Sequence, residues 1–182
     1  EHPNVAALAQ HIEDLRGGGQ YRNAVASGVI AHVQHRSAPL PLSYAQQRLW
    51  FLDQLEPDSS LYNIIDVVRL NGRHDTFALE RGFSKLIDRH ESLRTRFVET
   101  DGQPTQVILP PSSFSLTVED LSAISPNERQ SHLQALLDQE AELPCNLSNG
   151  PLMRARLFRL AAEEHVLALT MHHIISDAWS TN

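Results

Sequence analysis

Two adjacent histidines, His172 and His173, are followed four residues later by an aspartate, Asp177. Histidine suits general acid–base chemistry near neutral pH, because its reference pKa lies close to that pH. A nearby carboxylate can fix the tautomer of an imidazole and the geometry of the loop around it. These residue types indicate acyl transfer, in which a histidine deprotonates an incoming amine or hydroxyl and the protein supplies no covalent nucleophile.

The histidine pair also has two other interpretations. The sequence contains ten histidines, so one adjacent pair is unsurprising, and a histidine at the end of a strand often serves only as a hydrogen-bonding group. Two histidines and a carboxylate can also hold a metal ion such as iron. Neighbouring residues of a strand point to opposite faces, which makes the pair a poor chelate, and we expect no metal site.

The residues before the pair predict a central, buried strand, because "HVLALTMHH" (165–173) is nearly all apolar. The strand is expected to end near "SDAWS", where serine, aspartate and a small residue permit a turn. On that strand one imidazole would face the core and the other a cleft. Asp177 would lie on the following loop, within reach of an imidazole or an arginine.

Helices and strands are mixed in the rest of the chain. Ser43 is expected to cap a helix over 44–55. Ser125, Pro126 and Glu128 predict a capping box that opens a helix ending at 142. A further helix is expected over 74–92, with one apolar face formed by Leu79, Phe83, Leu86 and Ile87. Strands are expected over 62–70, 93–99, 105–109, 115–120 and 152–160. This mixture predicts an α/β fold, in the form of an α+β two-layer sandwich.

Composition narrows the class of protein. The net charge of −7 argues against a nucleic-acid binder. No apolar run approaches the roughly 18 residues of a membrane span, and the first residues lack the features of a signal peptide. Cys145 is the only cysteine, which excludes an internal disulfide and favours an ordinary small residue in a reducing, cytoplasmic setting.

The chain is expected to divide into three parts. Residues 1–15 have apolar side chains at helical spacing, and three consecutive glycines then end the helix. Residues 16–38 are interpreted as an interdomain linker. The denser pattern from residue 39 to 182 predicts the folded domain.

Three stretches, in order, resemble the motifs of condensation domains in nonribosomal peptide synthetases. "HHIISDAWS" is similar to the family's HHxxxDG signature, "LSYAQQRLWFLDQLEPDSSLYNI" (42–64) to its first motif and "RHESLRTRFVETDGQPTQVI" (89–108) to its second. The first motif most resembles the subtype that joins two L-configured residues. "EHPNVAALAQHIEDL" resembles the last helix of a peptidyl carrier domain. The resemblance implies a carrier tail at 1–15 and the first half of a condensation domain at 39–182, cut just past its signature.

The resemblance implies a chloramphenicol-acetyltransferase-like half, which a second half would complete around an active-site tunnel. The implied reaction is peptide-bond formation, as the amine of an acceptor aminoacyl thioester attacks the donor thioester. Both substrates would be held on the 4′-phosphopantetheine of upstream and downstream carrier domains, with an adenylation domain in the same synthetase. No cofactor or metal bound directly to this domain is implied, and we expect the chain alone to be inactive.

The family's site roles map onto single residues of this sequence. His173 would be the base or amine-positioning group and His172 the structural histidine. Asp177 would hold the architecture through an arginine, for which Arg94 is the candidate. The family's glycine is replaced by Ala178, whose methyl group would narrow the space beside the reacting groups. Trp179 and Ser180 complete the expected support of the loop.

Two other functions fit the same residues. One is a stand-alone acyltransferase that takes an acyl group from coenzyme A or a carrier. The other is a non-catalytic module that only docks carrier domains.

Overall fold

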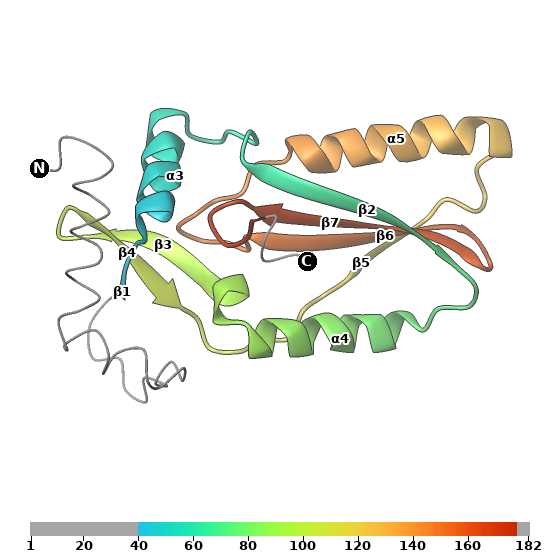
Figure 1. The fold of residues 1–182 in the computed structure, drawn as a ribbon. Helices are drawn as coiled ribbons and strands as arrows, with labels where there is room; N and C mark the ends of the chain where they lie inside the picture. Colours follow the sequence, from blue (N-terminus) through green and yellow to red (C-terminus); the bar gives the residue numbers. More distant parts are fainter. Residues whose placement is uncertain (1–39, 178–182) are drawn as a thin grey trace, which may run out of the picture. The chain divides into compact units, whose positions relative to one another are not determined.

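The computed structural model describes residues 40–177, all of which belong to the unit Pro39–Asn182. The predicted helix at 1–15, the linker at 16–38, and the site residues Ala178, Trp179 and Ser180 lie outside the described residues. The helices are α3 (Tyr44–Leu55), α4 (Thr76–Arg89), the 3₁₀ helix η1 (Glu91–Arg94) and α5 (Pro126–Glu142) (Figure 1). The strands are β1 (Leu40–Pro41), β2 (Asn63–Asn71), β3 (Thr95–Thr100), β4 (Gln103–Ile108), β5 (Thr117–Asp120), β6 (Met153–Ala161) and β7 (Glu164–His172).

The strands form two sheets. The larger has the order β2-β7-β6-β5, so the apolar strand β7 lies between two neighbours, as predicted. Its pairs are antiparallel except β5 with β6, which is parallel. The smaller sheet has the order β1-β4-β3 and is antiparallel. Asp101 and Gly102 connect β3 to β4 with φ values of 52° and 72°, the positive pair that a tight hairpin turn requires.

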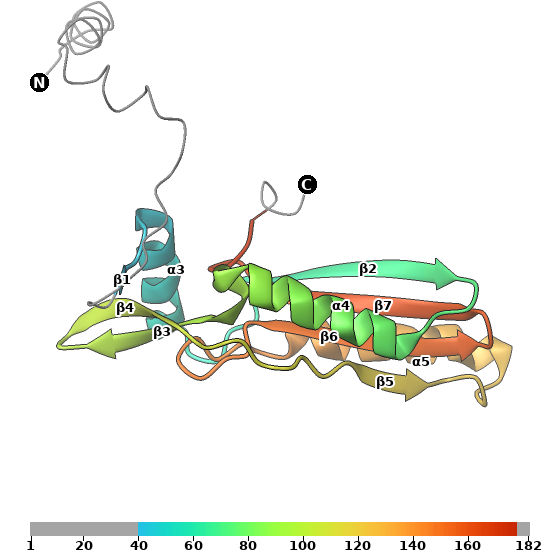
Figure 2. The ribbon, with the colours of Figure 1, turned by 90° about the horizontal axis from the view of Figure 1, so that it is seen from below.

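Helices cover both faces of the larger sheet. Strand residues alternate between faces, so Leu157 packs with the side chains of α4 and Phe158 packs with those of α5. Figure 2 shows α4 in front of the strands and α5 behind them. The mixed α/β class is confirmed, with one helix packed on each face of this sheet.

Helix α3 begins and ends at the predicted residues. The Ser43 hydroxyl accepts the N–H of Gln46 at 3.2 Å, and the Gln46 side chain accepts the N–H of Ser43 at 2.9 Å. This reciprocal capping box satisfies two backbone donors that the helix itself leaves unpaired. Trp50 on the same helix is half-buried against the core.

Two local expectations were wrong. The Ser125 hydroxyl donates to the Glu128 carboxylate at 2.6 Å instead of accepting a backbone N–H, so the predicted capping box is absent although α5 still begins at Pro126. Leu86 was expected on the apolar face of α4 but is 41% exposed, whereas its neighbour Ile87 is buried. Helical residues four apart share a face, so Ile87 packs in the same core cluster as Phe83, whereas Leu86 lies about 100° away around the helix.

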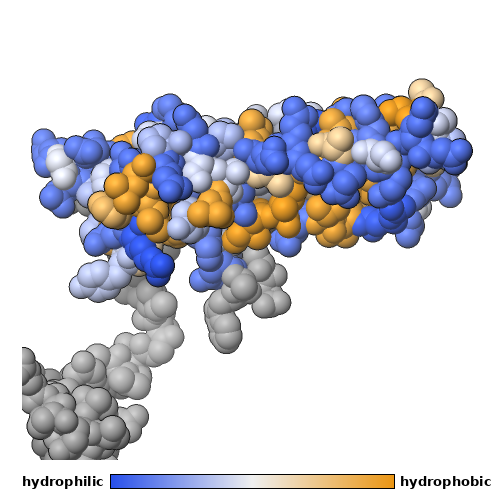
Figure 3. All heavy atoms as spheres, turned by 90° about the horizontal axis from the view of Figure 1, so that it is seen from above, coloured by the Kyte–Doolittle hydropathy of each residue, from blue (hydrophilic) through white to orange (hydrophobic). Residues whose placement is uncertain are grey.

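Apolar side chains also remain at the surface of the described residues. Figure 3 shows them as orange areas across the face seen from above. The most exposed are Tyr44, Leu61, Phe77 and Leu55. Within residues 40–177, no helix has both the length and the apolar character needed to cross a membrane.

Candidate active site at the end of strand β7

His172 is the last residue of β7 and lies inside the protein. Its Cα pairs with that of Asn63 on β2, and its backbone N–H donates to the carbonyl of Leu152 at 2.9 Å. The residue is only 2% exposed. Strand pairing on one side and a backbone bond on the other therefore hold His172 in place.

The His172 ring serves as a buried acceptor. Its Nδ1 accepts the backbone N–H of Ile174 at 3.1 Å, and the Tyr62 ring lies 6.3 Å away between centroids. An accepting Nδ1 carries no proton, so the neutral ring holds its proton on Nε2. Burial, with a smaller effect from the neighbouring His173, lowers the pKa of His172 to about 4. The ring is therefore neutral at physiological pH.

His173 is the first residue beyond β7 and is exposed. Its backbone N–H donates to the carbonyl of Tyr62 at 2.8 Å, and its ring Nδ1 lies 2.8 Å from the carbonyl oxygen of Ser176. A carbonyl oxygen only accepts, so Nδ1 must be the donor. In the neutral ring the unprotonated atom is then Nε2, which provides the lone pair that a general base needs.

Buried residues anchor the loop that carries His173. Ile174, Ile175 and Ser176 are 3%, 8% and 9% exposed, and both isoleucines belong to the hydrophobic core. The N–H of Ile175 also donates to the carbonyl of His172 at 3.1 Å. Because these three residues are buried, the exposed His173 and the exposed Asp177 lie at the two ends of an anchored turn.

Gln46 is a contact of this loop that sequence reasoning missed. Its Nε2 donates to the carbonyl of Ile174 at 3.3 Å, while its Oε1 accepts the N–H of Ser43. One side-chain amide thus joins the start of α3 to the histidine loop. The sequence indicated Ser43 as the cap, but nothing there indicated that Gln46 has a partner 128 residues away.

Arg94, the predicted partner of Asp177, lies at the end of η1. Its guanidinium donates to the carbonyl of Leu109 and pairs with Glu91 at 3.6 Å. The 3₁₀ turn brings Glu91 within reach of the arginine three residues later. The pairing of Arg94 with Asp177 stays a prediction.

Neither a metal site nor a cysteine nucleophile emerges from the described residues. Between residues 40 and 177, no three His, Cys, Asp or Glu side chains gather in a way that could hold a metal ion. Cys145 is buried, and burial raises the pKa of its thiol. The Arg154 guanidinium donates to its sulfur at 3.0 Å, so Cys145 belongs to the packing around β6.

Comparison with known proteins identifies relatives for most of the chain. A family model described as "Condensation domain" matches residues 37–182. A component of the linear gramicidin synthase from Brevibacillus parabrevis is 43% identical over 180 residues, which cover 99% of this chain and 4% of that protein. Malpibaldin synthetase from Mortierella alpina is 43% identical over 178 residues, which cover 98% of this chain and 3% of that protein. The chain spans between 2% and 4% of the length of the first curated relatives that it matches.

Solved structures share the fold. The starter condensation domain of rhizomide synthetase, crystallised as an arginine variant with C8-CoA, has a TM-score of 0.69 and 32% identity over 76% of this chain and 31% of that chain. The first condensation domain of the calcium-dependent antibiotic synthetase, with a substrate analogue, has a TM-score of 0.68 and 26% identity over 75% of this chain and 33% of that chain. This chain thus spans about a third of the length of each of these two condensation domains.

Proposed function

The chain belongs to the condensation-domain family, and we propose that it supplies the catalytic histidine loop of a peptide-bond-forming site in a nonribosomal peptide synthetase. The observation behind this proposal is the exposure of the His173 ring and the hydrogen bond that fixes its tautomer. Its ring is exposed on an anchored turn, and the Ser176 carbonyl holds the proton on Nδ1. Nε2 is therefore the atom that can accept a proton from a substrate.

In the proposed reaction, the α-amine of a carrier-bound acceptor attacks the carbonyl carbon of a carrier-bound donor thioester. The new C–N bond forms, and the C–S bond of the thioester breaks. His173 Nε2 accepts or orients the amine proton as the nitrogen becomes positively charged. The leaving thiolate of the donor phosphopantetheine takes up a proton, and the elongated peptide remains on the acceptor carrier.

The other residues of the loop have positioning roles in this proposal. His172 is neutral at physiological pH, and its ring holds the turn by accepting the Ile174 N–H. Asp177 lies at the far end of the loop, and we propose that it holds the architecture of the site through an arginine, with Arg94 as the candidate. Ala178, Trp179 and Ser180 follow directly in the sequence, and we propose that they border the reacting groups.

The partners in this proposal are the carrier domains before and after the condensation domain and the adenylation domain of the same synthetase. Residues 1–15 would be the end of the upstream carrier and residues 16–38 a linker. The remaining half of the domain would complete the tunnel, so this chain alone is expected to be inactive. The first motif favours a donor and an acceptor that are both L-configured.

A second candidate is acyl transfer from coenzyme A. It is favoured by one observation, the C8-CoA bound to the rhizomide starter domain. The two candidates differ in their donor, so a complete module that contains this chain can be given either a carrier-bound aminoacyl donor or the same acyl group on coenzyme A. Intact-protein mass spectrometry of the acceptor carrier then measures transfer.

We expect the acceptor carrier to gain the donor's mass only when the donor is carrier-bound. Equal transfer from the coenzyme A thioester, with no upstream carrier present, would favour the second candidate. Omission of the acceptor amino acid is the matched control, because peptide-bond formation then has no nucleophile.

A further inference from the structure

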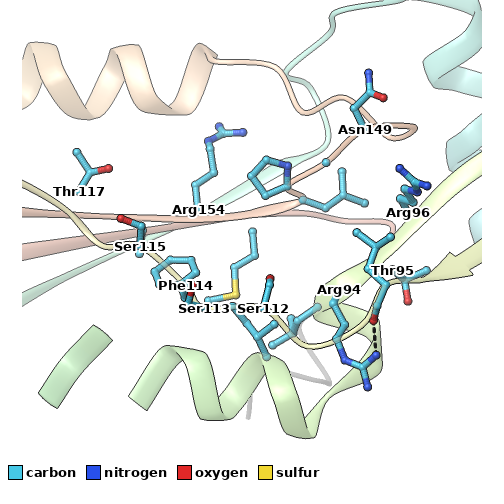
Figure 4. Close-up of a pocket in the computed structure, with 18 of the residues that line it drawn as sticks. Arg94, Thr95, Arg96, Ser112, Ser113, Phe114, Ser115, Thr117, Asn149 and Arg154 are labelled. Atoms are coloured by element: carbon cyan, nitrogen blue, oxygen red, sulfur yellow. Dashed lines mark hydrogen bonds between the residues drawn. The ribbon is translucent and has the colours of Figure 1, made fainter. Parts of the chain in front are cut away.

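A cavity of about 860 Å³ lies beside strand β6, on the side away from β7 (Figure 4). Strand β5 pairs only with residues 156–159 of β6, so residues 153–155 have no strand neighbour on this side. Those residues line the cavity together with residues 112–115, which precede β5, and the segment 94–96. Among the described residues that line it, none belongs to the histidine loop at 172–177.

Two arginines of β6 line the cavity and are neutralised by neighbouring carboxylates. The Nε of Arg154 lies 2.8 Å from Glu140 Oε1, and an Nη of Arg156 lies 3.6 Å from Glu140 Oε2. Arg156 also pairs with Glu119 at 2.7 Å. These four side chains form a balanced network, with two cations and two anions, so they leave no charge for a ligand to neutralise.

Two further arginines line the cavity from η1 and β3. Arg94 pairs with Glu91 and donates to a backbone carbonyl. Arg96 forms no hydrogen bond or ion pair with any residue between 40 and 177, and its Nε is shielded from solvent. The Nε atoms of Arg94 and Arg156 are also unpartnered, but their side chains have other partners. The cavity therefore holds one unbalanced positive charge, on Arg96.

A partly buried guanidinium without an acceptor is unfavourable, because it loses hydration that no protein group replaces. Arg96 is not exposed as a solvated surface charge would be. Figure 4 places its guanidinium at the same end of the cavity as Asn149. An anion with acceptor oxygens would satisfy Arg96 at that end, because guanidinium binds such groups in a forked geometry.

The other residues that line the cavity indicate the chemistry of the rest of the ligand. Its apolar side chains include Leu93, Phe114, Leu152 and Met153, and its neutral hydrogen-bonding groups include Ser113 and Ser115. A volume of about 860 Å³ is in the range of small-molecule sites. We infer that this cavity binds a monocarboxylate with an apolar body, whose carboxylate pairs with Arg96. This inference does not depend on the proposed reaction.

The chain contains two methionines, and they provide a direct probe. Met153 lines the cavity, whereas Met171, its partner across the β6–β7 pair, does not. With methyl-¹³C methionine in the full chain, 4-phenylbutyrate should shift the Met153 methyl signal in a saturable way. Met171 should move little, which makes it an internal control.

Three comparisons test the role of Arg96. The uncharged analogue 4-phenylbutan-1-ol should bind at least about tenfold more weakly than 4-phenylbutyrate, because it lacks the carboxylate. Arg96→Met keeps the apolar stem and should weaken the binding of 4-phenylbutyrate by a similar factor. Arg96→Lys should retain part of the affinity for 4-phenylbutyrate. Arg69→Met is the matched control, since Arg69 lies on β2 and pairs with Glu164.

The inference is overturned if 4-phenylbutyrate leaves the Met153 signal unmoved at millimolar concentration. It is equally overturned if the alcohol binds as tightly as the carboxylate. The inference is also overturned if Arg96→Met binds 4-phenylbutyrate as tightly as the parent chain does. If Arg96→Met fails to fold, Arg96→Lys and the comparison of acid with alcohol decide the question without it.

Discussion

The end of strand β7 and the turn that follows it place two adjacent histidines in opposite environments. His172 belongs to the strand, is 2% exposed and accepts a hydrogen bond from the backbone. His173 belongs to the turn, is exposed and donates a hydrogen bond to the backbone. Of these two adjacent residues, His172 therefore stabilises the fold and His173 can react.

The difference arises from hydrogen bonding as well as from burial. At His172 the partner is an N–H, so the ring proton lies on Nε2, and at His173 the partner is a carbonyl, so the proton lies on Nδ1. The two rings thus have opposite tautomers when both are neutral. Two identical side chains have been given different chemistry by the backbone around them, and each of the following predictions tests that distinction.

The largest effect is expected from His173→Ala in a complete module. We expect peptide formation to fall by about 10²–10⁴-fold, because a positioned general base contributes a factor of that order. The free energy of unfolding should change little, since the side chain is exposed. Single-turnover transfer between loaded carriers measures the first quantity, and urea denaturation measures the second. His132→Ala, at an exposed position on α5, is the matched control, and a rate within tenfold of the parent would remove His173 from the chemistry.

His172→Ala should have its main effect on stability. The change removes a buried ring and leaves the Ile174 N–H without an acceptor, which together should cost about 2–4 kcal/mol in the free energy of unfolding. His172→Asn should recover part of this loss, because its Oδ1 can accept the same N–H. Urea denaturation of both variants measures the difference. A His172→Ala variant as stable as the parent would contradict the structural role.

Acidification should weaken the fold through His172. The folded pKa of about 4 lies below the ordinary value of 6.5, so between these pH values the unfolded chain binds a proton that the folded chain does not. The free energy of unfolding should therefore fall as the pH is lowered from 6.5 towards 4, by at most about 3 kcal/mol from this residue. Denaturation across this range measures the slope.

His172→Asn provides the control for this slope. His165 also has a lowered pKa, caused chiefly by its burial, so the variant should keep part of the dependence on pH. Its curve should be shallower than that of the parent. Identical slopes would show that His172 takes up its proton as easily in the folded chain as in the unfolded one.

The smallest effect is expected from Gln46, which tests whether α3 helps to hold the reactive turn. Gln46→Glu keeps the oxygen that accepts the Ser43 N–H, but it removes the donor to the Ile174 carbonyl. We expect the transfer rate to fall about three- to tenfold, since small displacements in an active site reduce rates. Stability should change little.

Gln46→Ala loses both contacts and should also lose about 1 kcal/mol in the free energy of unfolding, as expected for a damaged helix cap. The two variants separate the cap from the loop contact. A full transfer rate in Gln46→Glu would mean that the loop does not depend on α3.

The local parts of this structure were predictable from the sequence, and the long-range parts were not. The bounds of α3 followed from Ser43, and the central position of β7 followed from its apolar residues. The reach of Gln46 to Ile174 depends on how distant segments pack, which periodicity does not encode. For the same reason, an alternating pattern shows that a strand has two faces but does not show which helix covers each face.

The decisive measurement is the tautomer of each of the two histidines. In the full chain at pH 7.5, a long-range ¹H–¹⁵N correlation spectrum distinguishes protonated from unprotonated ring nitrogens. We expect a proton on Nε2 of His172 and on Nδ1 of His173. The same tautomer at both rings, or a proton on Nε2 of His173, would show that the backbone does not give the two rings different chemistry.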